Sequence, residues 1–147
     1  ALKNNQSFAP IELGNMYSKR DWSDSRDFVK GVWLMLNQKE PRDYLLASGE
    51  THSIKEFLEK AFRAAGMSGS WTEVDDDPRT LKFYNNSEKH ENLVCTNEKF
   101  YRPAEVELLL GDPSEAKEKL GWEPEISFDK LVKTMVQFDI ENCETKA

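Results

Sequence analysis

The chain has 147 residues, a formal net charge of −7 and 38% hydrophobic residues. This length suits one domain or one piece of a larger protein, and no apolar run reaches the roughly 18 residues of a membrane span. The acidic balance disfavours nonspecific nucleic-acid binding. Two cysteines without CxxC spacing and two isolated histidines suggest free thiols and no metal site. With no signal-peptide pattern at the start, we expect a cytoplasmic protein.

The clearest local signals are helix caps. Asp24 or Ser25 can cap a first helix with one apolar face. Ser53 and Glu56 have the spacing of a capping box for a second helix, which Gly66 would end. The apolar residues assigned to these two helices are Phe28, Val29, Val32, Trp33 and Leu36 in the first, and Ile54, Phe57, Leu58, Ala61, Phe62 and Ala65 in the second.

Two shorter signals follow towards the C-terminus. Pro113, after Asp112, fits the first position of a third helix that ends at Gly121. A fourth helix is expected to begin near Ser127. Its predicted buried residues are Phe128, Leu131, Val132, Met135 and Phe138.

Strand signals are weaker than helix signals. The segment 75–91 is polar and contains Pro78, so we expect a long surface loop there, with the loosely patterned region reaching about residue 97. Leu108–Leu110 is expected to be a buried bend. The candidate strands are Ile11–Leu13, Tyr44–Ala47, Ser70–Val74 and Asn92–Thr96. The predicted fold is a small, helix-rich α/β domain over residues 1–147.

Two arginine motifs carry the candidate chemistry. In Lys19-Arg20-Asp21-Trp22, an arginine before a helix start can present its guanidinium to a phosphate, with Asp21 orienting it from behind. The alternative is a surface Arg–Asp pair beside a buried tryptophan. Nearby, Asn15 and Met16 are a place where backbone could contact a base.

The second motif is Arg102-Pro103-Ala104-Glu105. Pro103 favours an extended Arg102, which suits a diphosphate, while Glu105 can accept hydrogen bonds from ribose hydroxyls. The alternative is an ion pair within a loop. No glycine-rich nucleotide loop, no G-x-S-x-G elbow and no Tyr-x-x-x-Lys pair occurs, so the chain carries no recognisable catalytic machinery.

In combination and order, these motifs resemble the C-terminal region of the GDP-mannose 4,6-dehydratase family. The matching stretches are Leu13-Gly14-Asn15, Lys19-Arg20-Asp21-Trp22, Asp27-Phe28-Val29, Trp33-Leu34-Met35-Leu36, Ala47 to Ser53, Tyr101 to Glu107, Leu110-Gly111-Asp112-Pro113 and Ala116 to Trp122. The resemblance covers nearly the whole chain, apart from about 75–97.

The resemblance implies the substrate-binding lobe of an extended short-chain dehydrogenase/reductase without its Rossmann half. Such enzymes bind NADP in that missing N-terminal half, which also holds the catalytic residues, and convert GDP-mannose to GDP-4-keto-6-deoxymannose on the route to GDP-fucose. This chain alone would be inactive and bind no cofactor. Its implied partners are GDP-mannose, the rest of the enzyme, and further copies in a dimer or tetramer. The implied substrate contacts are Arg20, Arg102, Glu105, Asn15 and Lys19.

The chain departs from the family pattern in two places. Ser23 and Asp24 stand where the family usually has Gly-His, and an acid beside a diphosphate would weaken binding unless it turns away to cap the helix. The region before Phe100 lacks the expected glycines and carries Glu88, Glu91 and Glu98. These departures favour the alternative hypothesis, a noncatalytic dehydratase-derived module that binds a protein or a nucleotide-sugar.

Overall fold

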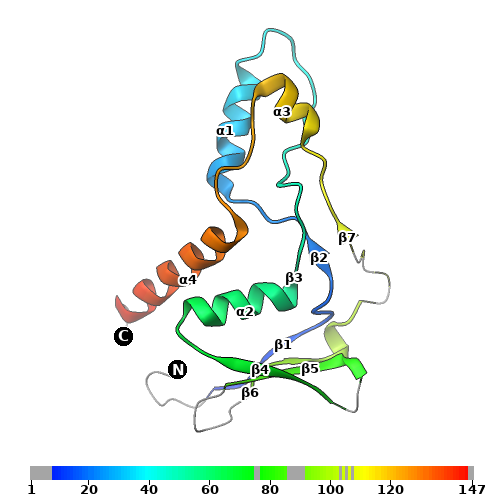
Figure 1. Ribbon diagram of the computed structural model, residues 1–147, viewed down its shortest axis with the longest axis vertical. Coiled ribbons are helices and arrows are strands. Elements are labelled where there is room, and N and C mark those ends of the chain that lie inside the picture. The colour runs from blue at the N-terminus through cyan, green and yellow to red at the C-terminus, as the bar shows by residue number, and fades with distance from the viewer. Residues whose placement is uncertain are drawn as a thin grey trace. The chain divides into compact units, whose positions relative to one another are not determined.

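The computed structural model describes residues 8–74, 77–85, 92–102, 104, 106 and 108–145. The chain divides into two compact units. Unit 1 comprises residues 1–17 and 66–105, and unit 2 comprises residues 18–65 and 106–147. The described residues form four α-helices and two separate sheets, one in each unit, which confirms the mixed α/β class (Figure 1).

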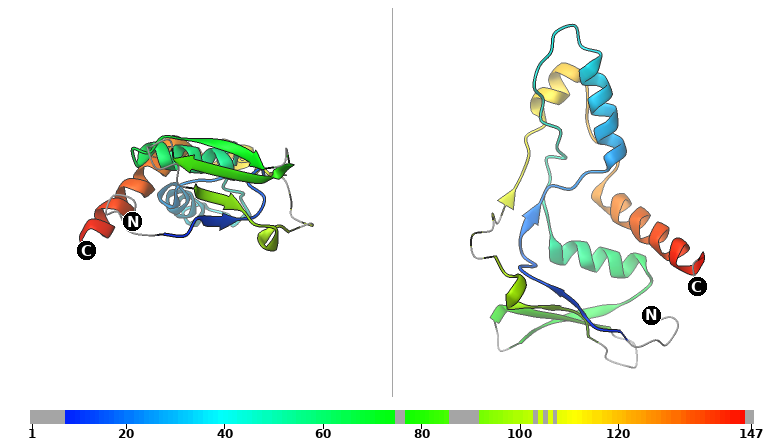
Figure 2. Two further views of the ribbon diagram at one scale, coloured as in Figure 1. Left: turned by 90° about the horizontal axis from the view of Figure 1, so that it is seen from below. Right: turned by 180° about the vertical axis from the view of Figure 1, so that it is seen from behind.

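Unit 1 is built on a four-stranded sheet of order β1-β6-β5-β4. Strand β1 runs parallel to β6, and the other two pairs are antiparallel. A 3₁₀ helix, η1, follows β6 (Figure 2). The bounds are β1 Ile11–Leu13, β4 Gly69–Val74, β5 Asp77–Asn85, β6 Asn92–Thr96 and η1 Glu98–Phe100.

The predicted loop over 75–91 is wrong for residues 77–85, which form the inner strand β5. The reason is a short alternation within a polar stretch: Leu81 and Phe83 are buried, two residues apart, on one face. Phe83 lies opposite Trp71 on β4 and Val94 on β6. Two buried side chains, one of which has partners on both neighbouring strands, stabilise a strand that composition alone disfavours. The predicted strand over Asn92–Thr96 is confirmed as β6.

Unit 2 contains a three-stranded sheet of order β3-β2-β7 and all four α-helices. Strand β2 occupies the centre, antiparallel to β3 and parallel to β7. Helix α1 lies beside α3, and α2 beside α4 (Figure 1). The bounds are β2 Lys19–Arg20, α1 Ser25–Leu36, β3 His52–Ser53, α2 Ile54–Ala64, β7 Leu108–Leu109, α3 Ser114–Leu120 and α4 Phe128–Thr145.

The helix ends agree closely with the caps in the sequence. Asp24 caps α1 by accepting a hydrogen bond from the Arg26 N–H, and Ser53 caps α2 through the Glu56 N–H. Gly121 ends α3 in the left-handed conformation, with φ of 65°. Pro113 sits at the N-cap of α3, one residue before its predicted place. None of the helices in the described part of the chain is long and apolar enough to cross a membrane.

Two expectations about unit 2 are wrong. Tyr44–Ala47 has no strand assignment: Leu46 instead packs its side chain against Gly31 of α1, and Ala47 is buried next to Gly111. Leu108–Leu110 is not a buried bend, because Leu108–Leu109 forms β7 and all three leucines are exposed. Both segments are apolar, but their residue types alone do not show which neighbours pair with them or bury them.

The apolar faces of α1 and α4 are also less covered than predicted. On α1, Val29 is 67%, Trp33 64% and Leu36 80% exposed, and Val32 is exposed as well. On α4, Phe128 and Val132 are buried, whereas Met135 and Phe138 are exposed. The side of α1 that is buried carries Asp27 and Gly31 instead. The helix periodicity was therefore correct, while the burial inferred from it was not.

Candidate functional site

Strand β2 fixes the first arginine motif between two segments distant in sequence. Arg20 pairs with His52 on β3 and with Leu109 on β7. The Asp21 N–H continues this pairing by donating to the Leu109 carbonyl at 3.1 Å. The strand thus joins the segment around residue 20 to the segments around residues 52 and 109.

The Arg20 side chain is half-buried and is held by main chain. Its Nη1 donates to the Lys19 and Val106 carbonyls, each at 2.8 Å. Val106 belongs to unit 2 and follows the last residue of the second motif. The guanidinium is therefore held by main chain of its own strand and of the segment that leads into β7, while Lys19 beside it is exposed.

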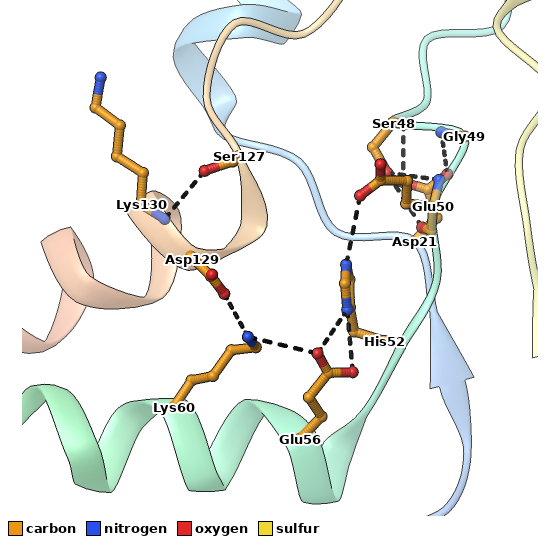
Figure 3. A network of polar contacts seen from close by, with 10 residues as sticks. All are labelled: Asp21, Ser48, Gly49, Glu50, His52, Glu56, Lys60, Ser127, Asp129 and Lys130. Atoms are coloured by element: carbon orange, nitrogen blue, oxygen red, sulfur yellow. Dashed lines mark hydrogen bonds and ion pairs between the residues drawn. The ribbon is translucent and has the colours of Figure 1, made fainter.

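Asp21 contributes to this site differently from the prediction. Rather than supporting Arg20 from behind, its carboxylate accepts hydrogen bonds from the main chain of Ser48, Gly49 and Gly111 (Figure 3 shows the first two). The Ser48 hydroxyl also donates to it, at 2.6 Å. Sequence spacing could not reveal these contacts, because Ser48 and Gly111 lie 27 and 90 residues away.

Asp24 turns towards its helix, as the sequence required if the nearby site is to bind an anion. Its carboxylate caps α1 and pairs with the Arg26 guanidinium at 2.7 Å. The hydrogen bond from the Arg26 side chain lowers the pKa of Asp24 to about 2. The charge of Asp24 is therefore satisfied locally.

A second polar cluster ties β3 and α2 to α4 (Figure 3). The His52 ring stacks on Phe128 with centroids 3.8 Å apart, and its Nδ1 lies 3.0 Å from the Glu56 carboxylate. Lys60 pairs with Asp129 of α4 at 2.5 Å, a contact that raises the pKa of Lys60 and lowers that of Asp129. The Glu56 carboxylate thus pairs with His52 and Lys60. The predicted capping box would instead have it accept a hydrogen bond from the Ser53 N–H.

Unit 1 holds the other candidate residues. The Asn15 side chain accepts a hydrogen bond from the Tyr17 N–H at 2.9 Å, which shapes the turn after β1. Arg102 is exposed and makes no hydrogen bond or ion pair with any described residue. Glu105, with Pro103, lies outside the described residues.

Within unit 1, the segments carrying Asn15 and Arg102 come together. A Cβ at Gly14 would overlap the Phe100 carbonyl oxygen, so the two backbones touch where only glycine fits. The Asn97 N–H also donates to the Leu13 carbonyl, at 2.8 Å. Asn15 and Arg102 therefore follow two backbones in direct contact, while Lys19 and Arg20 belong to unit 2.

The chain has relatives in other organisms at more than 40% sequence identity. It is 42% identical over 140 residues to the GDP-mannose 4,6 dehydratase of Cricetulus griseus, covering 92% of this chain and 35% of that protein. The Dictyostelium discoideum GDP-mannose 4,6 dehydratase is 44% identical over 136 residues, covering 89% and 36%. The chain thus spans about a third of the length of these relatives.

Solved structures share the fold at lower identity. One is RMD from Pseudomonas aeruginosa complexed with NADPH, with a TM-score of 0.67 and 19% identity, covering 92% of this chain and 37% of that one. Another is dTDP-glucose 4,6-dehydratase from Bacillus anthracis in complex with NAD, with a TM-score of 0.64 and 15% identity, covering 92% and 36%.

A family model matches nearly the same part of the chain. The model described as GDP-mannose 4,6 dehydratase matches residues 2–135, most of the chain and both arginine motifs. The chain therefore belongs to the GDP-mannose 4,6 dehydratase family.

Proposed function

We propose that this chain is the substrate-binding, C-terminal part of a GDP-mannose 4,6-dehydratase of the extended short-chain dehydrogenase/reductase type. The whole enzyme would convert GDP-mannose to GDP-4-keto-6-deoxymannose, a lyase reaction on the route to GDP-fucose, in the cytoplasm. The observation that carries this proposal is the family match over residues 2–135, a range that includes both arginine motifs.

The proposed substrate contacts use the two motifs in different ways. Arg20 binds the diphosphate from a fixed position, since main chain already holds its Nη1. Arg102 is exposed and free to form a charge-assisted, bidentate contact with phosphate oxygens. Glu105 accepts from the ribose hydroxyls. Asn15 and Lys19 lie near the nucleotide.

Hydride chemistry is assigned to a part of the protein that this sequence does not contain. NADP would supply the hydride acceptor and donor when bound. The residues present do not fit it, because the sequence contains no glycine-rich stretch of the kind that binds a dinucleotide. We therefore derive no catalytic step from this chain, whose task is to hold the GDP moiety.

The remainder of such an enzyme is also the proposed partner of the exposed apolar residues of unit 2. The relatives are about three times as long as this chain. Val29, Trp33 and Leu36 on α1 form a stripe at helical spacing that a soluble protein would normally cover. We place the rest of the enzyme on this stripe. Full-length protein would then assemble further as a dimer or tetramer.

An assay of the full gene product tests the proposal. Incubated with GDP-mannose and NADP, it should form the 4-keto-6-deoxy sugar, whereas the 147-residue chain alone should form none. Product from the isolated chain would overturn the assignment of the chemistry to another part. A full gene product that binds GDP but forms no product would favour the noncatalytic module.

A further inference from the structure

The carboxylate of Asp21 connects three segments of unit 2 that lie far apart in sequence. Its Oδ1 accepts from the Ser48 N–H at 2.9 Å and from the Ser48 hydroxyl at 2.6 Å. Its Oδ2 accepts from the Gly49 N–H at 3.0 Å and the Gly111 N–H at 3.4 Å. One half-buried side chain thus binds the turn after Ala47 and the residue that follows Leu110.

The backbones around Asp21 approach too closely for side chains to fill the space. A Cβ at Gly111 would overlap the Cβ of buried Ala47. Gly49 has φ of +77°, a conformation that side chains disfavour. The N–H groups of these segments therefore point at a common acceptor, and a carboxylate, which accepts at both oxygens, suits them.

Arg20 depends on the same segments. Its strand is paired on one side with β7, which ends two residues before Gly111, and on the other with β3, which begins three residues after Gly49. Its Nη1 bonds to Val106, two residues before β7. A displacement of either segment would move the strand and the carbonyl that hold the guanidinium.

The geometry points to Asp21 as a positioning residue for Arg20, which sets the place of the arginine by joining the main-chain segments on both sides of β2. This inference rests on the proposed function of Arg20 as a diphosphate contact. Asp21 itself would not touch the nucleotide. Asp21 would therefore act through its hydrogen bonds to the main chain and not through a direct contact of its charge with Arg20.

The variant Asp21→Asn tests this role with minimal change of volume. The asparagine keeps one oxygen for Ser48 but turns an NH₂ group towards the Gly49 N–H, placing donor against donor. Asp112→Asn is the matched control. Asp112 also accepts from a serine N–H and hydroxyl, those of Ser114, but both bonds stay within one local turn.

The experiment is a double-mutant cycle in the full gene product, with GDP affinity measured by calorimetry. We expect Asp21→Asn to weaken GDP binding about 10- to 100-fold, the range observed for residues that orient the ligands of metal sites. In the Arg20→Ala background, the same change should cost less than about twofold, because Asp21 acts through Arg20. Asp112→Asn should match wild type.

The outcomes separate this inference from the proposed function. If Arg20→Ala weakens binding but Asp21→Asn does not, the positioning role is wrong and the proposed function stands. An equal loss from Asp21→Asn in both backgrounds would indicate a general structural role and also overturn the inference. If wild type does not bind GDP, or Arg20→Ala binds as wild type does, both the role of Arg20 and the inference fail. Should Asp21→Asn not fold by circular dichroism, Asp21→Glu enters the same cycle, with the same outcomes.

Discussion

Helices α1 and α2 begin alike and end in different surroundings. Each starts at a side-chain cap and carries an apolar stripe. The stripe of α2 is half-buried: it lies beside α4, and its Phe57 ring contacts Trp22 and Phe128. The stripe of α1 faces outward, and the helix is held from its other side by Trp122 and the polar contacts of Asp27.

The difference shows what an amphipathic pattern reports. The pattern identifies the apolar face of a helix, but the partner of that face can lie far away in sequence or in another part of the protein. For α2 the partner is present. For α1 we have proposed that the partner is the rest of a longer enzyme. In this chain, mutations at its covered side should therefore lower the free energy of unfolding, and mutations at its open side should hardly change it.

The largest predicted contrast lies between two tryptophans. Trp122 is buried, and its indole N–H donates to the Asp27 carbonyl at 2.8 Å. Trp122→Ala should lower the free energy of unfolding of this chain by about 3–5 kcal/mol. Trp33→Ala, on the outer face of α1, should change it by less than about 0.5 kcal/mol. Urea unfolding followed by circular dichroism measures both. Comparable losses would mean that the outer face is covered.

Helix α4 offers the same contrast within one element. Phe128 is buried against His52 and Trp22, whereas Phe138, ten residues later, is exposed. Phe128→Ala should cost about 3 kcal/mol in the same unfolding experiment, and Phe138→Ala close to nothing. A cost at Phe138 near that at Phe128 would refute the described boundary between the covered and open parts of α4.

A smaller effect concerns the cap of α1 and depends on pH. The ion pair with Arg26 lowers the pKa of Asp24 from 3.8 to about 2. A lowered folded-state pKa contributes stability that is complete above pH 4 and is lost as the pH falls towards 2. Wild type should lose about 2 kcal/mol over this range relative to Asp24→Asn, which keeps a cap but has no charge to titrate. Parallel acid profiles for the two proteins would contradict the lowered pKa.

The smallest effect on stability should accompany a clear effect on association. Leu36→Glu places a charge on the outer face of α1, at a position 80% exposed. We expect this chain to self-associate through its open apolar residues, and Leu36→Glu to reduce that association while changing stability by less than about 0.5 kcal/mol. Light scattering reports the mass. Gln137→Glu, at an exposed polar position of α4, adds the same charge and should leave association unchanged. A wild-type monomer would refute the expectation.

Local signals in the sequence predicted the fold best. Ser53 and Gly121 predicted helix ends because a cap depends on its immediate neighbours. Strand β5 was missed because its apolar alternation is short, and because its burial depends on Trp71 and Val94 across the sheet, which are distant in sequence. Tyr44–Ala47 was predicted as a strand from its own residues, but a strand requires a paired neighbour.

The candidate site, like the fold, could be predicted from the sequence only in part. Arg20 and Arg102 could be selected from their motifs and from the family resemblance. The anchoring of Arg20 by Val106 and the bonds from Asp21 to Gly111 could not, since they join residues 86 and 90 positions apart. The contact of Gly14 with Phe100 likewise becomes visible only when β1 pairs with β6.

The most direct test of the proposed function is the affinity of the full gene product for GDP, measured by calorimetry with and without the Arg102 guanidinium. A charge-assisted contact contributes about 1.5–3 kcal/mol, so Arg102→Ala should bind GDP roughly 10- to 150-fold more weakly. Arg102→Lys should recover part of the loss, because an ammonium cannot reproduce the bidentate fork. Lys99→Ala, which removes a positive charge three residues away, should bind like wild type. Equal affinities for wild type and Arg102→Ala would contradict the assignment of Arg102 as a substrate ligand.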